Sequence, residues 1–143
     1  MAGARVGFAH GPKRAMQAIR AVHTFQMYAT ARPMQQSALR ALRQGEAWLQ
    51  ETRALYSSAA SMACQAVGCP KPAAGTFLFF DTQPFWKPGE DIETFLRRCV
   101  DAGVLLTPGS ASGKDYARWA RLCFTCLPPD ELSAALTCLR EVL

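Results

Sequence analysis

A single arginine, Arg121, opens an apolar segment that continues with Leu122, Cys123 and Phe124. A guanidinium beside an apolar strand is costly to bury unless an anion meets it, and its planar fork matches a carboxylate. If Leu122 and Phe124 face the core, strand alternation places Arg121 and Cys123 on the opposite face. The segment therefore indicates a carboxylate site. The alternative is a structural ion pair with an acid such as Asp115, which the spacing alone favours.

The same segment contains a C-x-x-C sequence, Cys123 to Cys126, with the spacing of a redox or zinc site. Residues three apart on a strand point to opposite faces, so these two thiols could share a ligand only if the chain turned there. Cys64 and Cys69 could complete four thiolates, but they lie in or just after a helical segment. We therefore predict no metal site. The six cysteines are expected to be reduced thiols that mostly fill the core.

The charge of the chain is uneven, because residues 1–45 carry seven basic side chains and no acidic one. Such a start is typical of a transit segment or a nucleic-acid-binding arm. No aromatic stacking pattern accompanies the charges, so a solvated or partner-facing surface is the favoured interpretation. With no run near ~18 apolar residues and no leader pattern, we expect a cytoplasmic protein without membrane or nucleic-acid partners.

The length and composition predict one globular domain with a core, since the chain has 143 residues of which 50% are hydrophobic. Hydrophobic periodicity predicts a layered α/β or α+β architecture. The 76–80 strand, a continuous apolar run, is expected to be buried on both faces. The expected elements in order are a strand at 5–9, a helix at 12–28, a long amphipathic helix at 33–67, a strand at 76–80, a helix at 90–102, strands at 104–107 and 121–125, and a last helix from 128.

Five segments occur in an order that identifies a family resemblance. They are AGARVGFAHGP, QSALRALRQGEAW, AGTFLFFD, FLRRCVDAGVLLTPGSASG and RLCFT with PPDEL. Together they resemble the C-terminal portion of a class I/II aminotransferase, a fold type I enzyme that depends on pyridoxal 5'-phosphate (PLP). The resemblance covers nearly the whole chain. Its most specific parts are the G-x-R-x-G start, the PGSA loop and the R-L-x-F strand.

The resemblance implies roles for two arginines. The arginine of the family's G-x-R motif binds the cofactor phosphate, and the corresponding residue here is Arg5. The arginine of the R-L-x-F strand binds the substrate α-carboxylate, and here it is Arg121, so the family supplies the anion that the spacing left open. Ser112 stands where the family's loop usually has an aromatic residue, which leaves the substrate preference open.

The resemblance also implies a Schiff-base lysine that is absent from this sequence. In the family it lies in a Ser-x-x-Lys motif shortly before the phosphate-binding arginine. None of the four lysines has that context; they are Lys13, Lys71, Lys87 and Lys114. Because the reaction needs that lysine to hold the cofactor and to move a proton, we expect no catalytic residue in this chain and no transamination by the chain alone.

The resemblance predicts three parts: the end of the large PLP-binding domain at 1–32, a long linking helix at 33–70, and the C-terminal small domain at 71–143. A short mixed or antiparallel sheet packed with helices is expected in the small domain. The complete enzyme would move an amino group from an amino acid to a 2-oxo acid, as a homodimer. The alternatives are a truncated, non-catalytic interaction module and a pseudoenzyme, lyase or decarboxylase of the same fold.

Overall fold

The computed structural model describes residues 2–143, and the chain divides into two compact units, Met1–Glu51 and Thr52–Leu143. The first contains a short 3₁₀ turn η1 (Ala2–Ala4), helix α1 (Lys13–Gln26), helix α2 (Arg32–Gln44) and the start of helix α3 (Glu46–Val67). The helix expected at 12–28 is confirmed as α1. The strand expected at 5–9 is wrong, because those residues have irregular backbone and form no strand.

The long helix expected at 33–67 is present as two helical segments that meet at Gly45. Gly45 caps the C-terminus of α2, where its N–H donates to the carbonyl oxygen of Ala41 at 2.9 Å. A Cβ on Gly45 would lie 2.5 Å from that same oxygen. The break therefore requires a glycine, and the hydrophobic stripe alone did not indicate it.

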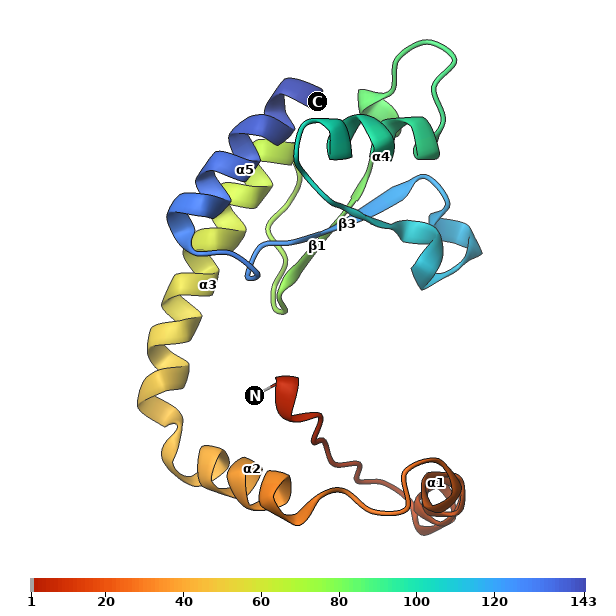
Figure 1. The fold of residues 1–143 in the computed structure, drawn as a ribbon, viewed down its shortest axis with the longest axis vertical. Coiled ribbons are helices and arrows are strands. Elements are labelled where there is room, and N and C mark those ends of the chain that lie inside the picture. The colour runs from red at the N-terminus through yellow and green to blue at the C-terminus, as the bar shows by residue number, and fades with distance from the viewer. Residues whose placement is uncertain (1) are drawn as a thin grey trace. The chain divides into compact units, whose positions relative to one another are not determined.

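The second unit is built on a three-stranded antiparallel sheet of order β1-β3-β2 (Figure 1). Strand β1 (Phe77–Asp81) pairs with β3 (Trp119–Cys123), and Phe79 lies opposite Arg121. Strand β2 (Thr107–Pro108) pairs with the other edge of β3. The antiparallel form of the predicted sheet is confirmed. The 104–107 strand shortens to β2 because only Thr107 and Pro108 reach the ladder.

Helices cover one face of this sheet. Helix α4 (Ile92–Asp101) follows β1, helix α5 (Pro129–Val142) follows β3, and α5 lies alongside the C-terminal part of α3 (Figure 1). Short 3₁₀ turns connect the elements: η2 (Gln83–Phe85), η3 (Gly109–Ser112) and η4 (Lys114–Tyr116). Within the described residues, no helix is long and apolar enough to cross a membrane.

The hydrophobic core belongs entirely to the second unit. Its buried residues run from Ala59 to Val142, and residues 3–51 contain none. Leu78 and Phe80 of β1 point into this core with Ala120 and Leu122 of β3. Residues on the other face of β1 are only partly covered, so the expectation of a strand buried on both faces is wrong. No second helical layer of this unit covers that face.

A largely buried ion pair between Arg98 and Glu90 ties three segments of the second unit together. The guanidinium of Arg98 on α4 donates to both carboxylate oxygens of Glu90, at 2.8 and 3.0 Å. It also donates to the carbonyl oxygen of Phe85, at 2.9 Å, and to that of Val142 in α5. The Glu90 side chain is only 5% exposed. The hydrogen bonds from Arg98 lower the pKa of Glu90 against the opposing effect of burial.

We predict that Arg98→Met destabilises the chain by about 3 kcal/mol, because it leaves a buried carboxylate unpaired. Urea unfolding followed by circular dichroism measures this. Arg97→Met is the matched control, since Arg97 is the neighbouring exposed arginine on the same helix.

The lowered pKa of Glu90 also gives the chain stability at neutral pH that is lost as pH falls through the acid range. Urea unfolding at a series of pH values should show a weaker dependence of the free energy of unfolding on pH in Glu90→Gln. An equal dependence in the variant and the unmodified chain would contradict the pairing.

Candidate carboxylate site on the open face of the sheet

Arg121 lies in the middle of β3, on the sheet face that the helices leave open. Its neighbours Ala120 and Leu122 are buried, whereas Arg121 is half-buried. Phe124 is buried as well, which confirms the alternation predicted for this segment. The sheet therefore holds the guanidinium at a fixed position, with solvent on one side. This is a suitable position for a side chain that recognises a planar anion.

Two contacts hold the Arg121 guanidinium in place. Its Nη2 donates to Oγ1 of Thr107 in β2, at 3.3 Å. The ring of Phe77 in β1 lies against it, with 4.4 Å from Cζ to the ring centroid. Both contacts fix the direction of the side chain without neutralising its charge. Phe77 was not among the residues expected here, because it reaches Arg121 diagonally across the ladder.

Arg121 makes no ion pair with any residue in the part of the chain that the structure describes. The ion pairs there are Arg98 with Glu90, and Arg118 with Asp81 at 3.0 Å. The alternative expectation, a structural ion pair with Asp115 or another acid, is therefore wrong. The acid nearest in the ladder, Asp81, is bound to Arg118 instead. The positive charge of Arg121 is therefore not neutralised by any acid among the described residues.

An aromatic cluster borders Arg121 on the same face. The rings of Phe79 and Trp119 stack at 5.3 Å, and Tyr116 contacts both rings edge to face. Sequence reasoning missed this cluster. The two aromatic residues in the segment from Lys114 to Trp119 were the available sign of such a cluster. The sequence does not show that the loop folds back and places Tyr116 on the strand.

The turn after β2 brings the predicted PGSA loop against this cluster. Gly109 is buried there, and a Cβ on it would lie 2.5 Å from the main-chain oxygens of both Tyr116 and Trp119. It would also lie 2.7 Å from Cβ of Trp119. The glycine of this motif is therefore required by close packing of the loop on β3, two residues beyond Thr107, which pairs with Arg121.

We predict that Gly109→Ala destabilises the chain by about 2 kcal/mol, because the added methyl group must displace main-chain atoms. Chemical unfolding followed by tryptophan fluorescence measures the change. Ser110→Ala, at the exposed neighbouring position, serves as the control and should leave the midpoint unchanged. A stability of Gly109→Ala equal to that of the control would show that the loop is free to move away.

Arg5, the second predicted site residue, belongs to the first unit. It is exposed and has a left-handed backbone with φ 52°, which is uncommon for a residue other than glycine. The flanking Gly3 and Gly7 have no atom within 4 Å of an added Cβ. Among the described residues, no neighbour therefore requires a glycine at either position. Arg5 lies in the first unit and Arg121 in the second, and the structure describes each within its own unit.

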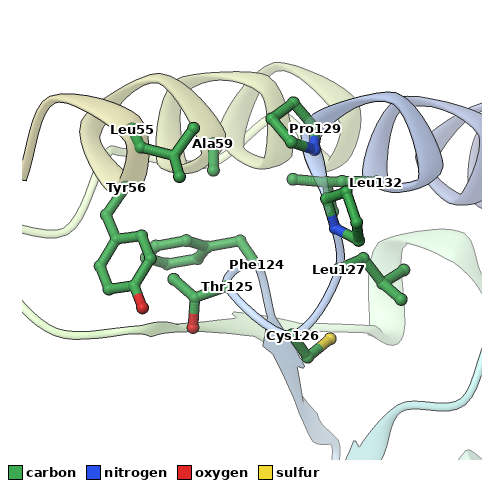
Figure 2. A pocket seen from close by; sticks show the side chains of 10 residues that line it. Leu55, Tyr56, Ala59, Phe124, Thr125, Cys126, Leu127, Pro129 and Leu132 are labelled. Carbon is green, nitrogen blue, oxygen red and sulfur yellow. The ribbon is translucent and has the colours of Figure 1, made fainter. Parts of the chain in front are cut away.

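A cavity of about 320 Å³ opens elsewhere in the second unit, between α3 and the segment that joins β3 to α5 (Figure 2). Most of its lining is apolar and includes Leu55, Phe124 and Leu132. Arg121 does not line it. The cavity is large enough for a small molecule, but it lacks the charged group that would orient a carboxylate.

The cysteines divide into two buried, two partly covered and two exposed residues. Cys64 and Cys99 fill the core as expected, but Cys126 and Cys138 are exposed, so the expectation that most cysteines are core residues is wrong. Among the described residues, no group of three or more histidine, cysteine or acidic side chains is placed to hold a metal ion.

Comparison with known proteins places this geometry in a family. The family model of aminotransferase class I and II matches residues 1–139. The chain belongs to this family. No curated protein matches the chain significantly.

Solved structures of aminotransferases share the fold. The chain is similar to an aminotransferase from Staphylococcus aureus, with a TM-score of 0.78, 27% identity, and coverage of 99% of this chain and 38% of that one. It is also similar to LysN, the α-aminoadipate aminotransferase of Thermus thermophilus, complexed with N-(5'-phosphopyridoxyl)-L-leucine (TM-score 0.79, 22% identity, coverage of 99% and 38%). The chain is similar as well to the kynurenine aminotransferase of Pyrococcus horikoshii, with a TM-score of 0.70, 22% identity, and coverage of 91% of this chain and 34% of that one. The chain thus spans less than two fifths of their length.

Proposed function

We propose that this chain is the carboxylate-binding part of a PLP-dependent aminotransferase, and that Arg121 binds the α-carboxylate of the amino acid and 2-oxo acid substrates. One observation carries the proposal: a half-buried guanidinium is fixed on the open sheet face and has no acidic partner among the described residues. Thr107 and Phe77 orient the fork, so that a carboxylate can accept two parallel hydrogen bonds from it. Membership of the aminotransferase family supplies the substrate class.

We propose that Arg5 binds the phosphate of PLP in the complete enzyme. Its guanidinium is exposed and makes no ion pair with any described residue, and the glycines on either side leave room for an anion to approach. These features fit a phosphate, whose charge a guanidinium meets in bidentate geometry. When bound, PLP supplies the electron sink for chemistry at the amino acid's α-carbon. In this proposal, Arg5 and Arg121 each bind one anionic group, the cofactor phosphate and the substrate carboxylate respectively.

The lysines of the chain support the further proposal that it has no catalytic residue of its own. Lys71, for example, donates to the hydroxyl groups of Ser57 and Ser61, at 2.8 and 3.0 Å, on the outside of α3. Neither this lysine nor the other three occurs in the family's Ser-x-x-Lys context. Transfer of the amino group would therefore need residues that this chain does not supply. We also propose that the chain has three parts, the end of the large domain at 1–32, a linking helix at 33–70 and the small domain at 71–143. The complete enzyme would be a homodimer in the cytoplasm.

We predict that a 2-oxo acid titrated into the chain shifts the Nε–Hε resonance of Arg121 in NMR spectra, with a Kd on the order of 1 mM for one bidentate ion pair. Arg118 is the internal control, because Asp81 already occupies it. Arg121→Lys should weaken binding, since an ammonium group lacks the fork. Equal shifts at Arg118 and Arg121, or an unchanged affinity in Arg121→Lys, would count against the assignment.

A second candidate function, that of an interaction module, rests on the first unit. Helices α1 and α2 bury no residue, and large apolar side chains are exposed there, with Phe25 92%, Phe8 87% and Leu42 75% accessible. Apolar surface of this extent is typical of a docking face. The partner we propose is the remainder of an aminotransferase fold, since the chain spans only 38% of the LysN and Staphylococcus aureus structures.

We predict that the purified chain associates with itself when that partner is missing. Sedimentation velocity should show species larger than the 15.6 kDa monomer, and Phe25→Glu together with Leu42→Glu should shift the population toward monomer. Leu105→Glu is the matched control, because Leu105 is 86% exposed in the second unit. A stable monomer of the unmodified chain would contradict the docking proposal and leave the carboxylate proposal to be decided by the Arg121 titration.

A further inference from the structure

Four of the six cysteines lie in two close pairs. In the first pair, the thiols of Cys64 and Cys69 both donate to the carbonyl oxygen of Pro70, at 3.6 and 3.7 Å. In the second pair, the thiol of Cys126 donates to the carbonyl oxygen of Cys123, at 3.2 Å. These two pairs offer a comparison within one chain, because they have the same chemistry in different surroundings.

The second pair is close because the strand ends at its first member. Strand β3 stops at Cys123, and the chain bends continuously from Phe124 to Leu127 before α5 begins. This turn removes the objection that residues three apart on a strand face opposite ways. The turn brings the Cys126 thiol back to the end of the strand, where it lies 3.2 Å from the carbonyl oxygen of Cys123.

The surroundings make Cys123 the more acidic thiol of its pair. Burial acts to raise its pKa, but hydrogen bonds from the main chain and side chains of Thr125 and Cys126 outweigh burial and lower it. The pKa of Cys126 is raised, first by burial and then by the neighbouring Cys123. In the other pair, burial and Cys64 raise the pKa of Cys69 to about 11. A thiolate is the nucleophile in disulfide exchange, so the lowered pKa of Cys123 favours it as the attacking thiol.

The second pair is also accessible. Cys126 is exposed and lines the cavity of about 320 Å³, together with Thr125 and Tyr56 (Figure 2). Cys123 is partly covered and lies on the open face of the sheet, two residues beyond Arg121. A small reagent can therefore approach this pair from solvent.

We propose that Cys123 and Cys126 form a reactive dithiol site that closes to an intramolecular disulfide in exchange with a low-molecular-weight disulfide such as oxidised glutathione. The Cys123 thiolate attacks one sulfur of the reagent, the reagent's S–S bond breaks, and one glutathione leaves as its thiolate. Cys126 then attacks the Cys123 sulfur and releases the second glutathione. Two protein thiols lose two electrons, the reagent gains them, and the two thiol protons pass to the two released glutathiones.

The test uses the reduced full chain, incubated with oxidised glutathione, blocked with an alkylating maleimide and analysed by peptide mass spectrometry. Cleavage after Arg121 and Glu131 separates this pair from Cys138, and cleavage after Phe124 divides Cys123 from Cys126 unless a disulfide joins them. The joined peptide should form about tenfold faster than any disulfide between Cys64 and Cys69.

Two variants identify the steps. In Cys126→Ser the second step is blocked, so a mixed disulfide with glutathione should accumulate on Cys123. Cys138→Ser is the matched control, an exposed cysteine without a partner thiol among the described residues, and should leave formation of the joined peptide unchanged. The proposal is overturned if the Cys64–Cys69 disulfide forms as fast as the Cys123–Cys126 disulfide. It is also overturned if the unmodified chain retains a stable mixed disulfide and forms no joined peptide.

Discussion

The one-sided burial of a three-stranded sheet is the constraint on which the second unit depends. Alternate residues of β1 and β3 enter the core beneath α3, α4 and α5, so the intervening residues must lie on the other face. A shift of one residue in the register would bury Arg121 and expose Leu122. The same alternation that forms the core therefore fixes the position of the guanidinium.

Charge is handled differently on the two sides of this sheet. On the helical side, Arg98 is bound within the structure, because Glu90 and the carbonyl oxygens around it satisfy its donors. On the open side, Arg118 is paired with Asp81, and Arg121 has only a hydroxyl and an aromatic ring as partners among the described residues. The contrast separates an arginine that holds the fold together from one whose charge has no acidic partner among the described residues, as the proposed carboxylate site requires. It also explains why the residue type alone could not distinguish the two roles.

The first unit differs from the second, because its helices have no hydrophobic core of their own among the described residues. Isolated helices of 13 or 14 residues, as in α1 and α2, are marginal in water, and most helical stability comes from packing of an apolar face. In this unit that face is exposed. The proposed partner, the remainder of an aminotransferase fold, would supply the packing that this apolar surface lacks; the chain spans only 38% of the similar structures.

The sequence by itself determined the family, the helices α1, α4 and α5, the strands around Phe79 and Arg121, and the alternation that places Arg121 outside the core. These follow from local periodicity and from motifs read in order, which depend little on distant contacts. Only the tertiary structure decided that Arg121 has no acidic partner among the described residues, that Gly45 divides the long helix, that Tyr116 folds onto Trp119, and that the chain turns after Cys123 to bring two thiols together. Each of these outcomes depends on side chains or main-chain atoms that a turn brings within a few ångströms, and such closeness has no signature in the spacing of residues along the chain.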